Sequence, residues 1–146
     1  MKPSAPPGHS SVSPYLVVED IEKELAFLSD VFGAEIQESL RNDSGEIWHG
    51  EARFGESVVM LGRASKEHPA FPSMLYVWVH DVDAAYKGAL KNGAQSIAEP
   101  ANQFYGNREA GVRDPQGNTW WIAREIEQLS NAEVERRLAK QRRERL

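Results

Sequence analysis

The chain repeats itself, and this repetition constrains its fold more than any other feature of the sequence. Val18-Glu19-Asp20-Ile21 in the first half corresponds to Val79-His80-Asp81-Val82 in the second, and Phe32-Gly33-Ala34-Glu35 corresponds to Asn92-Gly93-Ala94-Gln95. A repeat period of about half the chain is typical of a duplicated supersecondary unit. Each unit reads as one strand, one helix and three further strands. The sequence therefore predicts two tandem βαβββ modules of the α+β class.

Local signals in the first half support this pattern. Residues 12–18 alternate as a strand, and Pro14 within them indicates an edge strand or a strand start. Asp20 is a good helix N-cap, and Gly33 is a good residue to end a helix. Apolar residues at helical spacing between these two caps give the helix one buried stripe. The second half repeats the arrangement between Asp81 and Gly93.

The stretch 112–123 predicts a β-hairpin in the second half. Asp114-Pro115-Gln116-Gly117 has the turn chemistry, with a side chain that caps its own backbone, a fixed φ and a glycine. In the following strand, alternation directs Trp120 and Trp121 to opposite faces. Both faces of this sheet are therefore expected to be covered, one by helices and the other facing a cavity.

Residues 46–54 form a second strand of interest, because alternation gathers polar groups on it. His49, Glu51 and Arg53 are expected on one face. The other face is expected to carry Trp48, Gly50, Ala52 and Phe54.

Size and composition limit the function classes. A chain of 146 residues suits one domain, and the absence of cysteine excludes disulfides and thiolate chemistry. The net charge of −5 argues against nucleic acid as a partner. No apolar run approaches the ~20 residues of a membrane span, so no membrane association is expected. The N-terminus lacks a secretory signal, and we expect a cytoplasmic protein.

Composition also divides the chain. Residues 1–9 predict a flexible N-terminal arm, and 10–128 predict the domain, with modules at 10–63 and 73–128. The polar, proline-containing stretch 64–72 is expected to link them. Residues 129–146 predict a C-terminal helix, which opens with a capping box and has a thin apolar stripe.

Five blocks of sequence, taken together, carry a resemblance to a known family: Pro14–Asp20, Val31–Glu35, Gly55–Leu61, Asp81–Ala85 and Tyr105–Trp121. Over roughly residues 10–128, the chain resembles the vicinal oxygen chelate (glyoxalase / bleomycin resistance / dioxygenase) superfamily, and within it the PhnB-like subgroup. The resemblance implies a curled, barrel-like mixed sheet with helices on its outer face, and a homodimer.

The resemblance also identifies where the enzymes of this superfamily hold a divalent metal. The matching positions here are Ser13, Met60, Met74 and Trp121. Two thioethers, a hydroxyl and an indole are poor ligands for such an ion. Shifting the alignment by one residue brings in no better ligands. We therefore expect no metal and no other cofactor.

The same positions suggest a binding surface instead. Methionine and aromatic side chains form an adaptable lining for a flat or aromatic molecule. The first hypothesis is thus a metal-independent small-molecule-binding protein, as in drug sequestration. The alternative is that these residues only fill the cleft or a dimer seam, in an interaction module without ligand. The lining predicted is Tyr15, Met60, Met74, Tyr76, Trp78 and Trp121, with His49, Glu51 and Arg53 as polar groups.

A second hypothesis is an enzyme of glyoxalase, isomerase or dioxygenase type. His49 and Glu51 would act as a base and its orienting partner, and Glu109 could join them in a displaced metal site. The alternative for Glu51 is a structural ion pair with an arginine. Arg108 is interpreted as structural, and His9, His68 and His80 as exposed residues without convergent partners.

Overall fold

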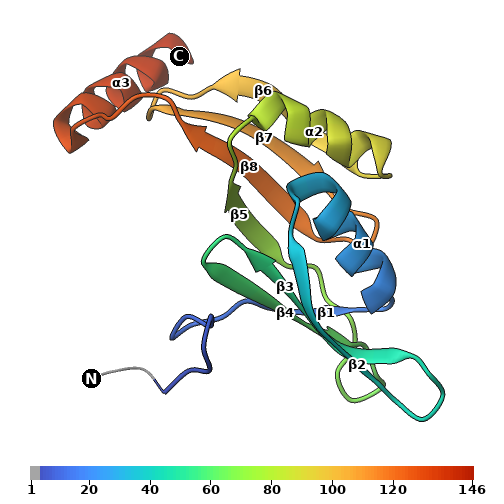
Figure 1. Ribbon diagram of the computed structural model, residues 1–146. Helices are drawn as coiled ribbons and strands as arrows, with labels where there is room; N and C mark the ends of the chain where they lie inside the picture. The colour runs from blue at the N-terminus through green and yellow to red at the C-terminus, as the bar shows by residue number, and fades with distance from the viewer. Residues whose placement is uncertain (1–3) are drawn as a thin grey trace.

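The computed structural model describes residues 4–146 and contains the two expected modules (Figure 1). Each module has the order strand, helix, three strands, and a final helix follows the second module. The elements of the first module are β1 (Tyr15–Val18), α1 (Ile21–Phe32), β2 (Glu35–Arg41), β3 (Ile47–Phe54) and β4 (Ser57–Arg63). Those that follow are β5 (Met74–Trp78), α2 (Val82–Lys91), β6 (Gln95–Asn102), β7 (Asn107–Arg113), β8 (Thr119–Glu125) and α3 (Asn131–Glu144).

Each module forms its own mixed four-stranded sheet. The strand order is β1-β4-β3-β2 in the first sheet and β5-β8-β7-β6 in the second. In both sheets the first strand pairs in parallel with the last, and the other pairs are antiparallel. The first strand is therefore an edge strand, and β1 starts directly after Pro14, as that residue predicted. The fold is α+β with curled sheets that do not close on each other.

The helix boundaries follow from their caps. The Asp20 side chain accepts a hydrogen bond from the backbone N–H of Lys23, and the Asp81 side chain accepts one from Ala84. Gly33 ends α1 in the left-handed conformation, with φ of 68°. Asn92 ends α2, one residue before the glycine expected to do so.

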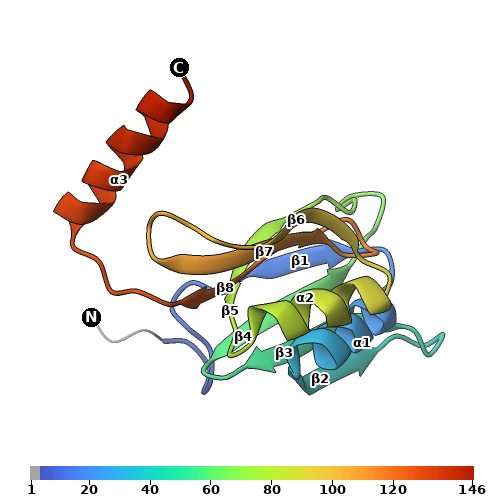
Figure 2. The ribbon, with the colours of Figure 1, turned by 90° about the horizontal axis from the view of Figure 1, so that it is seen from above.

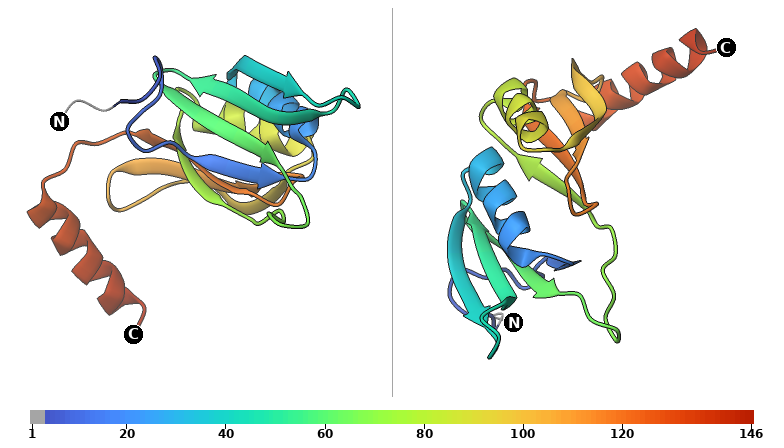
Figure 3. Two further views of the ribbon diagram at one scale, coloured as in Figure 1. Left: turned by 90° about the horizontal axis from the view of Figure 1, so that it is seen from below. Right: turned by 90° about the vertical axis from the view of Figure 1, so that its right-hand side faces the viewer.

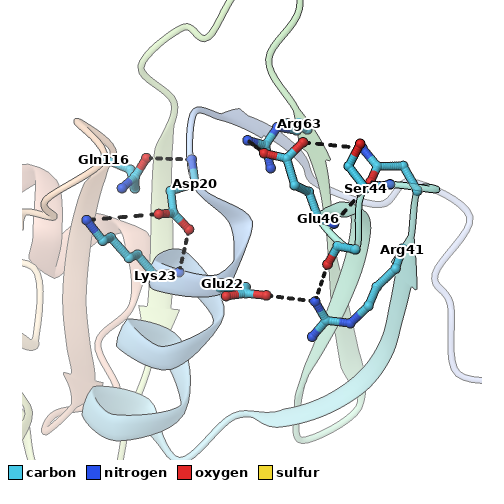
Figure 4. Close-up of polar contacts among 10 residues, drawn as sticks. Asp20, Glu22, Lys23, Arg41, Ser44, Glu46, Arg63 and Gln116 are labelled. Atoms are coloured by element: carbon cyan, nitrogen blue, oxygen red, sulfur yellow. Dashed lines mark hydrogen bonds and ion pairs between the residues drawn. The ribbon is translucent and has the colours of Figure 1, made fainter.

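The two modules join through the helix-covered sides of their sheets. Helix α1 packs against both its own sheet and α2, and one continuous apolar core includes residues of both modules. The Trp120 ring of β8 lies 5.3 Å from the Phe32 ring of α1 and 5.9 Å from the Phe54 ring of β3. A polar contact adds to this joint, because the Asp20 backbone N–H donates to the Gln116 side chain (Figure 4). Within residues 4–146, no helix lies on the other face of either sheet (Figure 3).

The turn at residues 114–117 has the predicted chemistry and also lies in this joint. Asp114 is buried, and its carboxylate accepts hydrogen bonds from the backbone N–H groups of Gln116 and Asn118 and from the indole of Trp120. Gly117 adopts φ of 93°. One side chain thus fixes the turn and the tryptophan at the centre of the core.

Helix α3 extends away from the two modules (Figure 2). It has no buried residue, and its contact with the body centres on one side chain. Arg137 donates to the Phe104 carbonyl and pairs with the Glu127 carboxylate, which holds the first half of the helix near the end of β8. Among residues 4–146 no helix has both the length and the apolar composition needed to cross a bilayer.

Candidate functional site

The helix-free face of the first sheet carries the five site residues predicted in that module. Tyr15 of β1, Met60 of β4 and Glu51 of β3 are direct neighbours across the strands. His49 and Arg53 flank Glu51 on the same side of β3, because side chains alternate along a strand. Alternation predicted that His49, Glu51 and Arg53 share a face, and the register of three strands places Tyr15 and Met60 beside them.

A polar chain runs across this face and centres on Glu51. The Glu51 side chain is only 10% exposed. One carboxylate oxygen lies 2.7 Å from His9 Nε2, and the other lies 3.2 Å from His49 Nε2. The Tyr15 hydroxyl lies 3.5 Å from His49 Nδ1. A carboxylate can only accept, so both Nε2 atoms carry a hydrogen in this arrangement. Glu51 thus orients two imidazoles, and His49 can in turn interact with the hydroxyl of Tyr15.

The position of His9 corrects the prediction that it is exposed and has no convergent partner. Its side chain is 15% exposed and contacts Glu51 directly. The chain bends at Gly8, where φ is 84° and where an added Cβ would lie 2.6 Å from the Arg53 guanidinium. Residues 5–10 therefore cross the open face instead of leaving it uncovered. His68 and His80 are exposed, as expected.

The crossing segment and the sheet enclose a polar pocket of about 570 Å³. Its floor includes Glu51 and Met60, and its other walls come from the segment that carries His9 and from β2. A volume of this size is typical of small-molecule sites. Ser13, the first of the positions that correspond to metal ligands, also lines this pocket.

Trp48 lies on the face opposite to the one predicted. The pairing of β2 with β3 shifts by one residue between Leu40–His49 and Arg41–Ile47, so β3 has a bulge at Trp48. The bulge lets Ile47 enter the core, while the Trp48 ring lies 5.9 Å from the His49 ring and is half exposed. The expectation that Trp48 shares a face with Gly50 and Ala52 was therefore wrong.

Trp48 contributes to a second, aromatic pocket of about 590 Å³ on the same open face. Tyr15 and Val17 of β1 form one side, and Phe71 of the 64–73 connection forms another. This connection passes from β4 to β5 as a loop outside the sheets (Figure 3). The sequence of 64–72 predicts a linker but does not predict that Phe71 lines a pocket, because a polar, proline-containing loop gives no periodic signal.

The other four predicted site residues lie on the helix-free face of the second sheet. Met74, Tyr76 and Trp78 alternate along β5, and Tyr76 is paired in register with Trp121 of β8. The first three are strongly exposed, with Met74 at 74%, and the Trp121 ring lies against Gly111. The two pockets of the first sheet include none of these residues. Within one chain, the nine candidates thus form two separate surfaces.

The donor set does not suit a metal. Ser13 and Met60 lie in the first module, whereas Met74 and Trp121 lie in the second. His9, Glu51 and His49 meet, but the Glu51 carboxylate contacts the Nε2 atoms of both imidazoles. No group of three histidine, aspartate or glutamate side chains in residues 4–146 is arranged to hold a metal ion. Glu109, considered for a displaced site with His49 and Glu51, lies instead in β7 of the other sheet. It is buried, and loss of hydration raises the pKa of its carboxyl group.

Arg108 has the structural role expected of it. Its guanidinium makes two hydrogen bonds, of 2.7 and 2.8 Å, to the Asp83 carboxylate of α2 and a third to Asn102. The pairing holds the start of β7 to the helix that covers it. These contacts raise the pKa of Arg108 and lower that of Asp83.

Comparison with known proteins gives consistent results. The model of the "Glyoxalase/Bleomycin resistance protein/Dioxygenase superfamily" matches residues 9–122. A relative from Mycobacterium bovis, "Uncharacterized protein Mb0911c", is 26% identical over 142 residues, which are 90% of this chain and 93% of the relative. "Uncharacterized protein Rv0887c" of Mycobacterium tuberculosis is also 26% identical, over 90% of this chain and 84% of that protein.

Solved structures show the same fold. TioX from Micromonospora sp. ML1 matches with a TM-score of 0.66 and 24% identity, over 79% of this chain and 99% of TioX. A glyoxalase/bleomycin resistance protein/dioxygenase family enzyme from Burkholderia phytofirmans PsJN matches with a TM-score of 0.64 and 21% identity, over 84% of this chain and all of that one, 100%.

Proposed function

Because the chain belongs to the glyoxalase/bleomycin resistance protein/dioxygenase superfamily, we propose that it binds a small apolar or aromatic molecule without a metal, as drug-sequestering members do. The observation that supports this most is the open face of the first sheet. There Tyr15 lines a pocket of about 590 Å³ and Glu51 lines one of about 570 Å³, and His49 contacts both residues. Ser13 and Met60 of the second pocket occupy two of the positions that correspond to metal ligands. Such a face binds a ligand through the apolar area that is buried and through complementary shape.

The proposal includes a homodimer. Met74, Tyr76 and Trp78 expose apolar surface side by side on β5, and a contiguous patch of this kind favours association. A second copy of the chain would bury this patch. Within the superfamily we assign the chain to the PhnB-like subgroup, on the blocks of sequence that carry that resemblance.

A titration tests the binding function. Purified protein is titrated with planar antibiotics, for example doxorubicin and tetracycline, while tryptophan fluorescence and calorimetric heats are followed. We expect saturable binding by at least one compound, and a loss of about tenfold in affinity for Tyr15→Ala, since an aromatic contact contributes of the order of 1 kcal/mol beyond its buried area. Tyr105→Ala, at an exposed tyrosine outside both pockets, serves as the control and is expected to bind like the natural chain. No saturable signal with any compound would overturn the proposal.

One observation favours a second candidate, an enzyme of glyoxalase, isomerase or dioxygenase type. The 3.2 Å contact between Glu51 and His49 Nε2 is the geometry of a base with an orienting carboxylate. Such an enzyme would convert an α-keto or aromatic substrate, and His49→Ala would abolish turnover while leaving the fold intact. Turnover that survives this substitution would remove the candidate.

A further inference from the structure

The aromatic pocket on the first sheet is built from parts of the chain that are distant in sequence. Tyr15 comes from β1, Trp48 from β3, and Phe71 from the connection between the modules. Their side chains are 46%, 50% and 54% exposed, which is unusual for three large rings around one hollow. Contact between water and these apolar rings is unfavourable, so a ligand that displaces this water binds with a more favourable free energy.

Local backbone features give this pocket its shape. The β-bulge turns Trp48 out of the alternation of β3 and onto the open face. Gly62 of β4 lets the Tyr15 ring lie flat on the sheet, since an added Cβ there would come within 2.5 Å of the Tyr15 hydroxyl oxygen. His49 joins the two rings, because its centroid lies 5.9 Å from each of theirs. Through His49, two rings of the pocket thus contact the polar chain that centres on Glu51.

The charges around the pocket are unequal. Arg63 lines it, but its guanidinium is paired with Glu46 at 2.9 Å (Figure 4). Glu67 also lines it, and no hydrogen bond or ion pair joins Glu67 to any residue of the described chain, 4–146. One carboxylate thus remains available beside aromatic rings. Aromatic faces also attract cations, so both features favour positive charge.

We propose that the aromatic pocket binds the planar, positively charged end of a small molecule, with Trp48 and Phe71 contacting its ring and Glu67 pairing with its charge. This deepens the proposed function by naming the class of ligand, and it depends on that function. The connection between the modules then selects the ligand as well as linking two halves.

Two probes with one ring system separate charge from shape. Proflavine is a planar cation at pH 8, whereas acridine is neutral at that pH. Calorimetric titration of the full-length protein gives a dissociation constant for each. We expect proflavine to bind about threefold more tightly than acridine, because Glu67 is exposed and an exposed ion pair contributes only about 0.2–1 kcal/mol. Equal affinities would overturn the assignment of charge.

Three variants locate the site. Glu67→Gln is expected to weaken the binding of proflavine about threefold and to leave that of acridine unchanged. Phe71→Ala is expected to weaken the binding of both about fivefold. Glu56→Gln, in the exposed β3–β4 turn, makes the same change in net charge and is expected to alter neither. Circular dichroism verifies that each variant is folded.

The outcomes distinguish this site from the proposed function as a whole. If proflavine binding resists Phe71→Ala and Glu67→Gln but weakens in Glu51→Gln, the ligand lies in the polar pocket, and the aromatic site is wrong while small-molecule binding remains. If neither these dyes nor the planar antibiotics bind, both proposals fail.

Discussion

The carboxyl group of Glu24 lies in α1, in the joint between the modules, where it is fully buried. Neither of its oxygens has a hydrogen-bond partner among residues 4–146, and the Asp114 carboxylate is its charged neighbour. Loss of hydration, with a further contribution from Asp114, raises the pKa of Glu24 to about 10. Glu24 is therefore protonated in the folded protein at neutral pH, and it ionises when the chain unfolds.

This difference predicts how stability depends on pH. Between about pH 4.5 and 10 the folded state holds one more proton than the unfolded state, so the free energy of unfolding decreases as pH rises. The slope from one such group is at most about 1.4 kcal/mol per pH unit. Glu24→Gln is expected to remove this slope and to be more stable than the natural chain at pH 8.

Urea unfolding at pH 5, 6.5 and 8 measures the effect. Glu19→Gln, an exposed position just before the helix, is the matched control and is expected to keep the slope of the natural chain. Identical slopes in the natural protein and in Glu24→Gln would show that Glu24 is ionised in the folded state.

At the scale of the elements, prediction of strands and helices from the sequence is correct where the element is regular. Asp20, Gly33 and the Asp114 turn have local chemistry that fixes a boundary, and the structure confirms each. It failed at Trp48, because a bulge depends on how the neighbouring strand is paired, and alternation within one strand carries no such information.

The site was predictable to the same extent. His49, Glu51 and Met60 meet because regular strands are in register, and their neighbourhood follows from alternation. His9 and Phe71 also reach this face, but they lie in segments with prolines and no periodic pattern. Their positions depend on tertiary packing, which the local sequence does not predict.

Helix α3 is expected to be almost independent of the two modules in its effect on stability. With no buried residue and a single anchoring arginine, the helix contributes little to the stability of the body. Removing residues 130–146 is expected to change the free energy of unfolding by less than about 1 kcal/mol. Urea unfolding of the shortened chain measures this, with Arg137→Ala as a second variant that only releases the helix. A loss of several kcal/mol would place α3 in an interface that one chain does not contain.

At the scale of the whole molecule, the exposed face of β5 is where we expect copies of the chain to associate. Met74 is 74% exposed and Trp78 61%, beside Tyr76. If this face is a dimer interface, a charge placed in it has to be buried, which is costly.

Met74→Asp is therefore expected to convert a dimer into a monomer at micromolar concentrations. Sedimentation velocity measures the change, and Ala84→Asp, on the exposed side of α2, adds the same charge as a control and is expected to remain dimeric. A natural protein that sediments as a monomer, or a dimer that persists in Met74→Asp, would contradict the assignment of this face.

The separate hydrogen bonding of the two sheets has a practical consequence. The backbone ladders stay within each half, so only side-chain packing and a few polar contacts join residues on either side of the 64–73 connection. A polypeptide cut in this connection would yield two fragments that each keep a complete ladder. The fragments should recognise each other through Trp120, Phe32 and Phe54, which makes the protein a candidate for fragment complementation, in which reassembly reports that two fused proteins have met.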